Sequence, residues 1–147
     1  MNRVEKILCP IDLKEDNDKV LITAASVARA FQAELVLAYI TPKFLKYSQR
    51  EFDSSSQNPF MKKLIDDGRQ KLEEVLSSEI LKGISSSVLI LSGSATEEIL
   101  KAIEQQEVDL VIMGTSGKEG WDHFILGSVA QNVLRGSNVP VMTVKPE

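Results

Sequence analysis

The sequence has little of what several classes of protein require. Its single cysteine cannot form an internal disulfide, which is typical of the reducing cytoplasm. With 17 basic and 21 acidic residues its net charge is −4, whereas a nucleic-acid-binding protein needs a basic face. No apolar run approaches the roughly 18–20 residues that span a bilayer, and the opening stretch MNRVEKILCPID does not have the pattern of a signal peptide. We therefore expect a cytoplasmic protein that binds neither nucleic acid nor membrane.

Metal-ligating residues are also scarce. The one histidine, His123, has no cluster of Cys, Asp or Glu around it at ligand spacing, so we expect no metal site formed by side chains. Cys9 lies inside an apolar run and is expected to be an inert core thiol.

The length of 147 residues fits one domain, which we expect to span residues 1–147. A chain of this size buries roughly 68–70% of its unfolded surface, so its core needs no disulfide or metal for stability. Residues 41–60 break the regular pattern and include the polar stretch FDSSSQNPF, which predicts a variable loop.

Short apolar runs alternate with helical patterns along the rest of the chain. The predicted strands are 7–11, 34–40, 87–91, 108–113 and 139–144. The predicted helices are 16–31, with Asp16 or Asn17 as N-cap, 60–82, one that begins at Ser94 with a Glu at its third position, and 127–135. This order predicts an α/β fold: a five-stranded parallel, doubly wound, Rossmann-like sheet with helices on both faces.

Ligands bind such sheets beyond the carboxyl ends of the strands, where the strand order reverses. Two unusual segments follow predicted strands there: Pro10-Ile11-Asp12 after the first, and GTSGKEGWDHFILGS, residues 114–128, after the fourth. If these two strands are neighbours, both segments face one crevice.

The glycine-rich segment does not fit the common phosphate motifs. Only two residues separate Gly114 from Gly117-Lys118, whereas a Walker A loop needs four. The dinucleotide fingerprint and the nucleophile elbow are absent as well. What fits is a helix that opens at Gly127-Ser128, because the free N–H groups and the dipole of a helix amino end bind anions.

Residues 114–129 match the signature Gly-x2-Gly-x9-Gly-Ser/Thr of the universal stress protein family. The stretches ILCPID, ATEEIL, VDLVIMG and VLRGSNVPVMTV are similar to that family too. The chain thus resembles the ATP-binding branch of the family over its whole length except residues 43–60. The resemblance implies the fold of the adenine nucleotide α-hydrolases.

The resemblance also implies roles for individual residues. The phosphates would be held by Gly117, Gly127, Ser128 and the N–H of Val129, the ribose side would be lined by Met113 and Gly114, and the adenine and ribose would be bounded by Ile11, Asp12 and Ile40. Two stretches depart from the family pattern: Leu13-Lys14-Glu15-Asp16 replaces a nearby Ser or Thr, and Trp121-Asp122-His123 lies within the motif. Both change the charge expected around the phosphates.

Several of these residues have an alternative interpretation. Asp12 could accept hydrogen bonds from the nucleoside, or it could be a turn-forming Asp after a strand. Lys118 could add charge near the phosphates or be a solvated loop residue. Trp121 could cap the nucleotide or cover the sheet edge.

The resemblance implies a regulatory module that binds ATP, with Mg²⁺ or Mn²⁺ carried on the phosphates, and that acts through an unknown protein partner. We find no catalytic base or arginine finger, so any hydrolysis should be slow. Two alternatives stay open: a nucleotide-using enzyme of the same fold, by adenylation or nucleotide α-hydrolysis, and a dimeric interaction module with an empty pocket.

The last predicted strand, 139–144, lies at the sheet edge by resemblance. Its residues Val141, Met142 and Val144 are largely apolar, and an open apolar edge is an aggregation hazard. Pairing with the same strand of a second copy would give a closed homodimer, as the family resemblance also implies. A proline at Met142 is expected to break that pairing.

Overall fold

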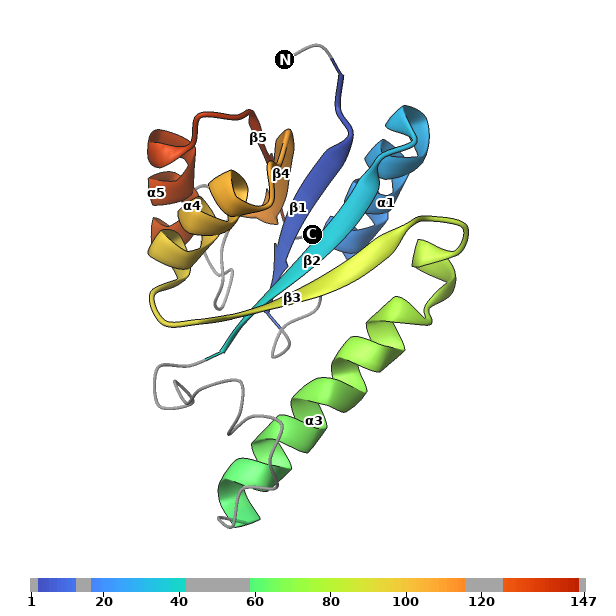
Figure 1. Ribbon diagram of the computed structural model, residues 1–147, viewed down its shortest axis with the longest axis vertical. Coiled ribbons are helices and arrows are strands. Elements are labelled where there is room, and N and C mark those ends of the chain that lie inside the picture. Colours follow the sequence, from blue (N-terminus) through green and yellow to red (C-terminus); the bar gives the residue numbers. More distant parts are fainter. Residues whose placement is uncertain (1–2, 13–16, 42–58, 116–125, 146–147) are drawn as a thin grey trace.

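The computed structural model describes residues 3–12, 17–41, 59–115 and 126–145. Its centre is a sheet of five parallel strands (Figure 1). The strands are β1 (Lys6–Ile11), β2 (Glu34–Thr41), β3 (Ser86–Ser92), β4 (Leu110–Gly114) and β5 (Val141–Val144), in the order β3-β2-β1-β4-β5. The predicted five-stranded Rossmann-like sheet is thereby confirmed, and β5 lies at an edge.

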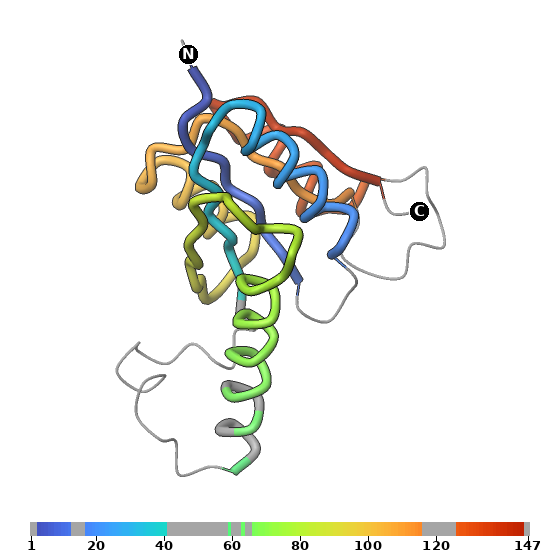
Figure 2. The backbone as a smooth tube through the Cα atoms, turned by 90° about the vertical axis from the view of Figure 1, so that its right-hand side faces the viewer, coloured from blue at the N-terminus to red at the C-terminus, as the bar shows by residue number. Residues whose placement is uncertain are grey.

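Helices cover both faces of the sheet. They are α1 (Asp18–Phe31), α3 (Pro59–Leu76), the short 3-10 helix η2 (Glu79–Leu81), α4 (Ala95–Gln105) and α5 (Ser128–Gly136). Figure 1 shows α1 on one side of the sheet and α4 with α5 on the other. Figure 2 shows that α3 runs well past the end of the sheet. None of the helices in the described part of the chain is long and apolar enough to cross a membrane.

The core has two halves, separated by the sheet. Along β1, Ile7, Cys9 and Ile11 belong to the α1-side cluster, while Leu8 belongs to the α4–α5-side cluster. Successive side chains of a strand point to opposite faces, so a strand covered on both faces must be apolar at every position. This explains why these strands appear in the sequence as continuous apolar runs.

The helix predicted over 60–82 is interrupted after Leu76. The hydroxyls of Ser77 and Ser78 donate to the backbone carbonyls of Glu73, at 2.7 Å, and Val75, at 2.8 Å. Serine hydroxyls that bond to nearby backbone in this way favour a helix end over its continuation. The separate η2 follows, so this part of the prediction was wrong in its extent.

Two strands begin later than predicted. The strand expected from Val108 begins at Leu110, because Asp109 turns its side chain toward β1. The strand expected from Val139 begins at Val141, because the Ser137 hydroxyl accepts the N–H of Val139 at 3.1 Å and donates to its carbonyl. In both cases a polar side chain forms a hydrogen bond with a backbone group that would otherwise pair with the neighbouring strand.

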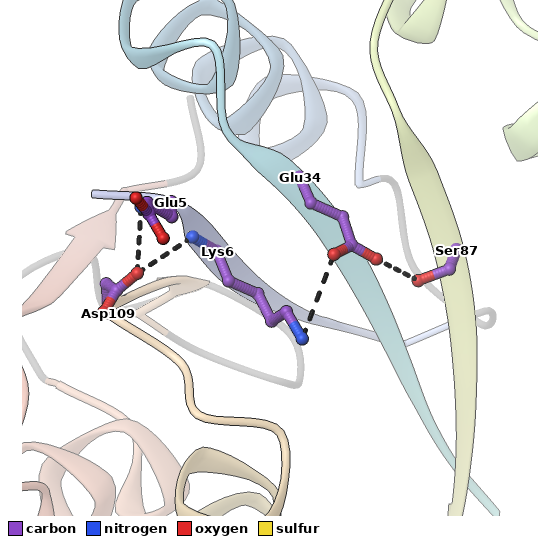
Figure 3. Close-up of polar contacts among 5 residues, drawn as sticks. All are labelled: Glu5, Lys6, Glu34, Ser87 and Asp109. Carbon is purple, nitrogen blue, oxygen red and sulfur yellow. Dashed lines mark hydrogen bonds and ion pairs between the residues drawn. The ribbon is translucent and has the colours of Figure 1, made fainter. Parts of the chain in front are cut away.

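Asp109 ties β1 to the start of β4 (Figure 3). One of its carboxylate oxygens accepts the backbone N–H of Glu5 at 2.9 Å and that of Lys6 at 3.0 Å. On the other side of β1, the ammonium of Lys6 lies 3.9 Å from the carboxylate of Glu34 on β2. The amino ends of the three central strands are therefore joined by polar contacts before the apolar ladder begins.

Cys9 is fully buried in β1, as predicted for a core thiol. Burial raises its pKa to about 12, because the thiolate would lose its hydration inside the sheet. The thiol is therefore protonated at every pH at which the fold would ordinarily be studied.

We expect Cys9 to be inert to an aromatic disulfide reagent at pH 8 in the native protein, since the thiolate is the reactive form. One thiol per chain should react once the protein is unfolded in guanidinium. The absorbance of the released thiol measures both. Native labelling as fast as that of free cysteine would contradict the buried position of β1.

We expect Asp109→Ala to lower the free energy of unfolding by about 1–2 kcal/mol, because two backbone N–H groups lose a charged acceptor. Glu34→Gln is the matched control. It removes a partly exposed ion pair and should change stability by no more than about 0.5 kcal/mol. Urea denaturation of the unaltered protein and the two variants measures these changes in the free energy of unfolding. An equal effect of the two substitutions would refute a special role for Asp109.

Candidate nucleotide site

The strand order reverses between β1 and β4. These strands are hydrogen-bonded neighbours, with Ile7 opposite Leu110 and Leu8 opposite Val111. From β1 the chain continues outward through β2 and β3, and from β4 it continues the other way to β5. The two unusual segments of the sequence therefore do leave adjacent strands at the same edge, where open parallel sheets bind their ligands.

The first of these segments is held by Asn17. Its side-chain oxygen accepts the backbone N–H of Asp12 at 3.4 Å, and its side-chain amide donates to the Asp12 carbonyl. Asn17 occupies the N-cap position of α1, as one of the two predictions had it, but its side chain makes no cap hydrogen bond there. The amide thus joins Asp12, the residue after β1, to the start of α1, and Asp12 is half-buried.

The second segment is closed by Thr115. Its N–H donates to the carbonyl of Val144 on β5 at 3.1 Å, and its carbonyl accepts the N–H of Gly127. Gly127 is the N-cap of α5, and its carbonyl accepts the N–H of Gln131 at 2.9 Å. Thr115 is also the one polar side chain that is buried among the described residues. The two ends of the glycine motif thus meet at the amino end of α5.

Most of the predicted binding residues lie along this edge. Met113 and Gly114 end β4, Ile11 ends β1, Asp12 follows it, Ile40 is the next-to-last residue of β2, and Gly127, Ser128 and Val129 open α5. Ser128 is exposed and Val129 half-buried. Gly117, Lys118, Trp121 and His123 lie outside the described residues.

Ile11 and Ile40 end adjacent strands, as expected, but they do not share a face. Ile11 is buried in the α1-side cluster, whereas Ile40 packs against the α4–α5-side cluster. The ladder pairs Ile11 with Tyr39, so Ile40 is one residue out of step and points to the opposite face. Of the two, only Ile40 lies on the side from which α5 approaches.

Tyr39 is a polar residue close enough for the charge of Asp12 to act on it, and the sequence did not identify it as a site residue. Burial raises the pKa of its phenol, and the charge of Asp12 raises it further. The backbone contacts of Thr115 and the contact of the Asn17 side chain with Asp12 were not predicted either. A Thr directly after Met113-Gly114 and an Asn five residues after Asp12 carry no signal by themselves, because their partners are set by the turn geometry.

The edge offers groups suited to a nucleotide. The first turn of α5 has N–H groups without acceptors inside the helix, and its dipole favours an anion there. Asp12 offers carboxylate oxygens to hydroxyl or amino donors. Within the described ranges, no group of three or more His, Cys, Asp and Glu residues is placed to hold a metal ion.

Comparison with known proteins identifies the family. A model of the universal stress protein family matches residues 3–145. Universal stress protein MJ0531 of Methanocaldococcus jannaschii is 28% identical over 147 residues, which cover 98% of this chain and 84% of that protein. The solved structure of MJ0577 from the same organism is 31% identical, with a TM-score of 0.71, and the match covers 98% and 97% of the two chains.

A universal stress protein from Archaeoglobus fulgidus, solved in complex with dAMP, shares the fold with a TM-score of 0.67 at 20% identity over 96% and 98% of the two chains. The topology found here is thus that of solved family members. Since the family model spans nearly all of the sequence, this chain belongs to the universal stress protein family.

Proposed function

We propose that the crevice at the carboxyl ends of β1, β2 and β4 binds ATP, with the phosphates at the amino end of α5. The observation that carries the proposal is the hydrogen bond from Gly127 to Thr115. It brings the start and the end of the Gly-x2-Gly-x9-Gly-Ser segment to one point, beside the helix end that attracts anions. The dAMP complex of a protein with this fold supports the same class of ligand.

The nucleoside would lie across the carboxyl ends of β1, β2 and β4. Asp12 would accept hydrogen bonds from ribose hydroxyls or from the adenine amino group, while Met113, Gly114 and Ile40 would line the apolar side. A divalent ion, Mg²⁺ or Mn²⁺, would be carried by the phosphates and its own waters. The protein would act in the cytoplasm as a regulatory module that reports its nucleotide state to a protein partner.

We further propose a homodimer through the edge of β5. Met142 is 39% exposed there, although it is apolar. The carbonyls of Pro140 and Val144 accept N–H groups of Val111 and Thr115 on the inner side. Backbone groups of successive strand residues point to opposite sides, so Met142 also faces β4, and Val141 and Thr143 face outward. A proline at Met142 would therefore damage the sheet itself, and the outward position Thr143 is the better test.

We expect Gly127→Val combined with Ser128→Ala to abolish ATP binding while the fold remains. The branched side chain would occupy the space beside the helix end, and the hydroxyl donor would be lost. Equilibrium dialysis measures the affinity, and circular dichroism checks the fold. Gln131→Ala, one turn further along the exposed face of α5, is the matched control and should keep its affinity. Unchanged binding in a folded double variant would refute the phosphate site at α5.

We expect Thr143→Pro to convert the protein from dimer to monomer, because proline removes an outward N–H from the edge. Thr143→Ala keeps that N–H and should remain dimeric. Sedimentation equilibrium gives the mass of each protein. An unaltered protein that has the mass of one chain at high micromolar concentration would rule out the dimer.

A further inference from the structure

Ser92 carries a buried hydroxyl that is not paired. The residue as a whole is half-buried, but its hydroxyl oxygen is buried. Of the buried side-chain nitrogen and oxygen atoms of the described residues, this oxygen is the one without a hydrogen-bond partner. Native proteins pair nearly all of their buried polar groups, because an unpaired hydroxyl loses its hydration without compensation. The hydroxyl of Ser92 therefore needs a partner that the described fold does not supply.

The sheet fixes the position of Ser92. It is the last residue of β3, and the ladder pairs it with Thr41, the last residue of β2. Gly93 follows with a φ of +125°, in the region that favours glycine, so the chain bends directly after Ser92 and enters α4 at Ala95. Ser92 is therefore held at the carboxyl edge, where the nucleotide is proposed to bind.

Two apolar residues precede Ser92 on its face of β3. Val88 and Ile90 pack against the α1-side cluster. Alternate residues of a strand share a face, so Ser92 continues this row toward the carboxyl edge. The side chains of Val88 and Ile90 offer a hydroxyl neither a donor nor an acceptor, so the partner of Ser92 has to come from beyond the strand ends.

β3 is the strand farthest from the proposed phosphate site on its side of the sheet. The order β3-β2-β1-β4-β5 separates it by three strand spacings of about 4.8 Å from β4, whose end is joined to α5 through Thr115. In a nucleotide the phosphates and the base are at opposite ends, with the ribose between them. A nucleotide that places its phosphates at α5 and crosses the strand ends therefore brings its base toward β2 and β3.

Ser92 is close to Ile40, which is proposed to line the nucleoside site. The ladder pairs Ile40 with Leu91, so Ser92 lies one residue further along the neighbouring strand. With a strand spacing of about 4.8 Å and a rise of about 3.3 Å per residue, the Cα atoms of Ile40 and Ser92 are about 6 Å apart. Ile40 packs on the α4–α5 side, whereas Ser92 belongs to the α1-side row. The two residues would thus approach a base beyond the strand ends from opposite faces.

A serine hydroxyl suits the edge of a base. It can donate one hydrogen bond and accept others, while adenine has ring nitrogens that accept and an amino group that donates. A buried hydroxyl also discriminates between ligands, because a ligand without a matching group leaves it unpaired.

We propose that the Ser92 hydroxyl forms a hydrogen bond with the base of the bound nucleotide, so that the base supplies the partner that the hydroxyl lacks. This contact rests on the proposed nucleotide function. It adds β3 to the binding site and makes Ser92 a residue that selects the base. The phosphates and the ribose do not depend on it.

The state of the hydroxyl is tested first without ligand. Ser92→Ala removes a hydroxyl that makes no contact in the free protein, so the unfolding temperature should stay the same or rise. Ser87→Ala is the matched control, since it removes a hydroxyl from the amino end of the same strand, where it donates to Glu34 at 3.3 Å. A clear fall in the unfolding temperature of Ser92→Ala would show that its hydroxyl has a partner in the protein itself and would overturn the proposal.

Equilibrium dialysis tests the role in binding. Ser92→Ala should weaken ATP binding roughly three- to tenfold, the range of one hydrogen bond, and leave the binding of inorganic tripolyphosphate unchanged. As competitors of ATP, AMP should weaken by the same factor, and ribose 5-phosphate, which lacks the base, should not change. Ser87→Ala should bind these ligands as the unaltered protein does. Unchanged ATP affinity in Ser92→Ala, or an equal loss for ribose 5-phosphate or tripolyphosphate, would overturn the contact with the base.

The unaltered protein separates this proposal from the function on which it rests. If it binds no ATP, the proposed function is wrong, and Ser92 has no base to contact. If it binds ATP and Ser92→Ala binds ATP equally well, the nucleotide site stands and only the role of Ser92 is wrong.

Discussion

The pairing of β1 with β4 is the constraint on which the rest of the structure depends. These two strands are far apart in the sequence, and between them the direction of winding reverses. The residues proposed to contact the nucleoside lie on, or just beyond, a strand whose position follows from this pair, and the start of α5, where the phosphates are proposed to bind, is joined to the end of β4 through Thr115. At the opposite end of the strands Asp109 holds the amino end of β1, so the register is supported by polar contacts as well as by the apolar ladder.

A second constraint works at the carboxyl edge. The backbone of Thr115 binds Val144 on one side and Gly127 on the other, so β5, the glycine segment and α5 meet at one residue. Backbone hydrogen bonds of Thr115 therefore connect β5, which carries the proposed dimer edge, with the amino end of α5, where the phosphates are proposed to bind. Asn17 has a similar role after β1, because its side-chain amide makes two hydrogen bonds to the backbone of Asp12.

Much of the fold could be predicted because the central strands β1, β2 and β4 are covered on both faces and are therefore apolar over most of their length. The errors fell at the ends of elements, where one polar side chain decides between ladder and turn. Ser77 and Ser78 end α3, while Asp109 and Ser137 delay β4 and β5. Ser94 is the N-cap of α4 as predicted, but within the described residues its side chain makes no cap hydrogen bond. Where an element begins or ends thus depends on hydrogen-bond partners that helix and strand propensities do not identify.

The sequence by itself determined the alternation of strands and helices, the two-sided burial of the strands and the family, because apolar periodicity and glycine spacing are local properties of the chain. The positions of Asp12, Met113, Gly114 and Gly127 near one edge also followed once the topology was known. Only the tertiary structure decided that Ile11 and Ile40 face opposite sides, that Thr115 bonds to Val144 and Gly127 and Asn17 to Asp12, and that Tyr39 lies opposite Ile11 in the β1–β2 ladder. These are relations between segments far apart in the chain or across a turn. They arise from strand register and backbone hydrogen bonding, and no single stretch of sequence contains them.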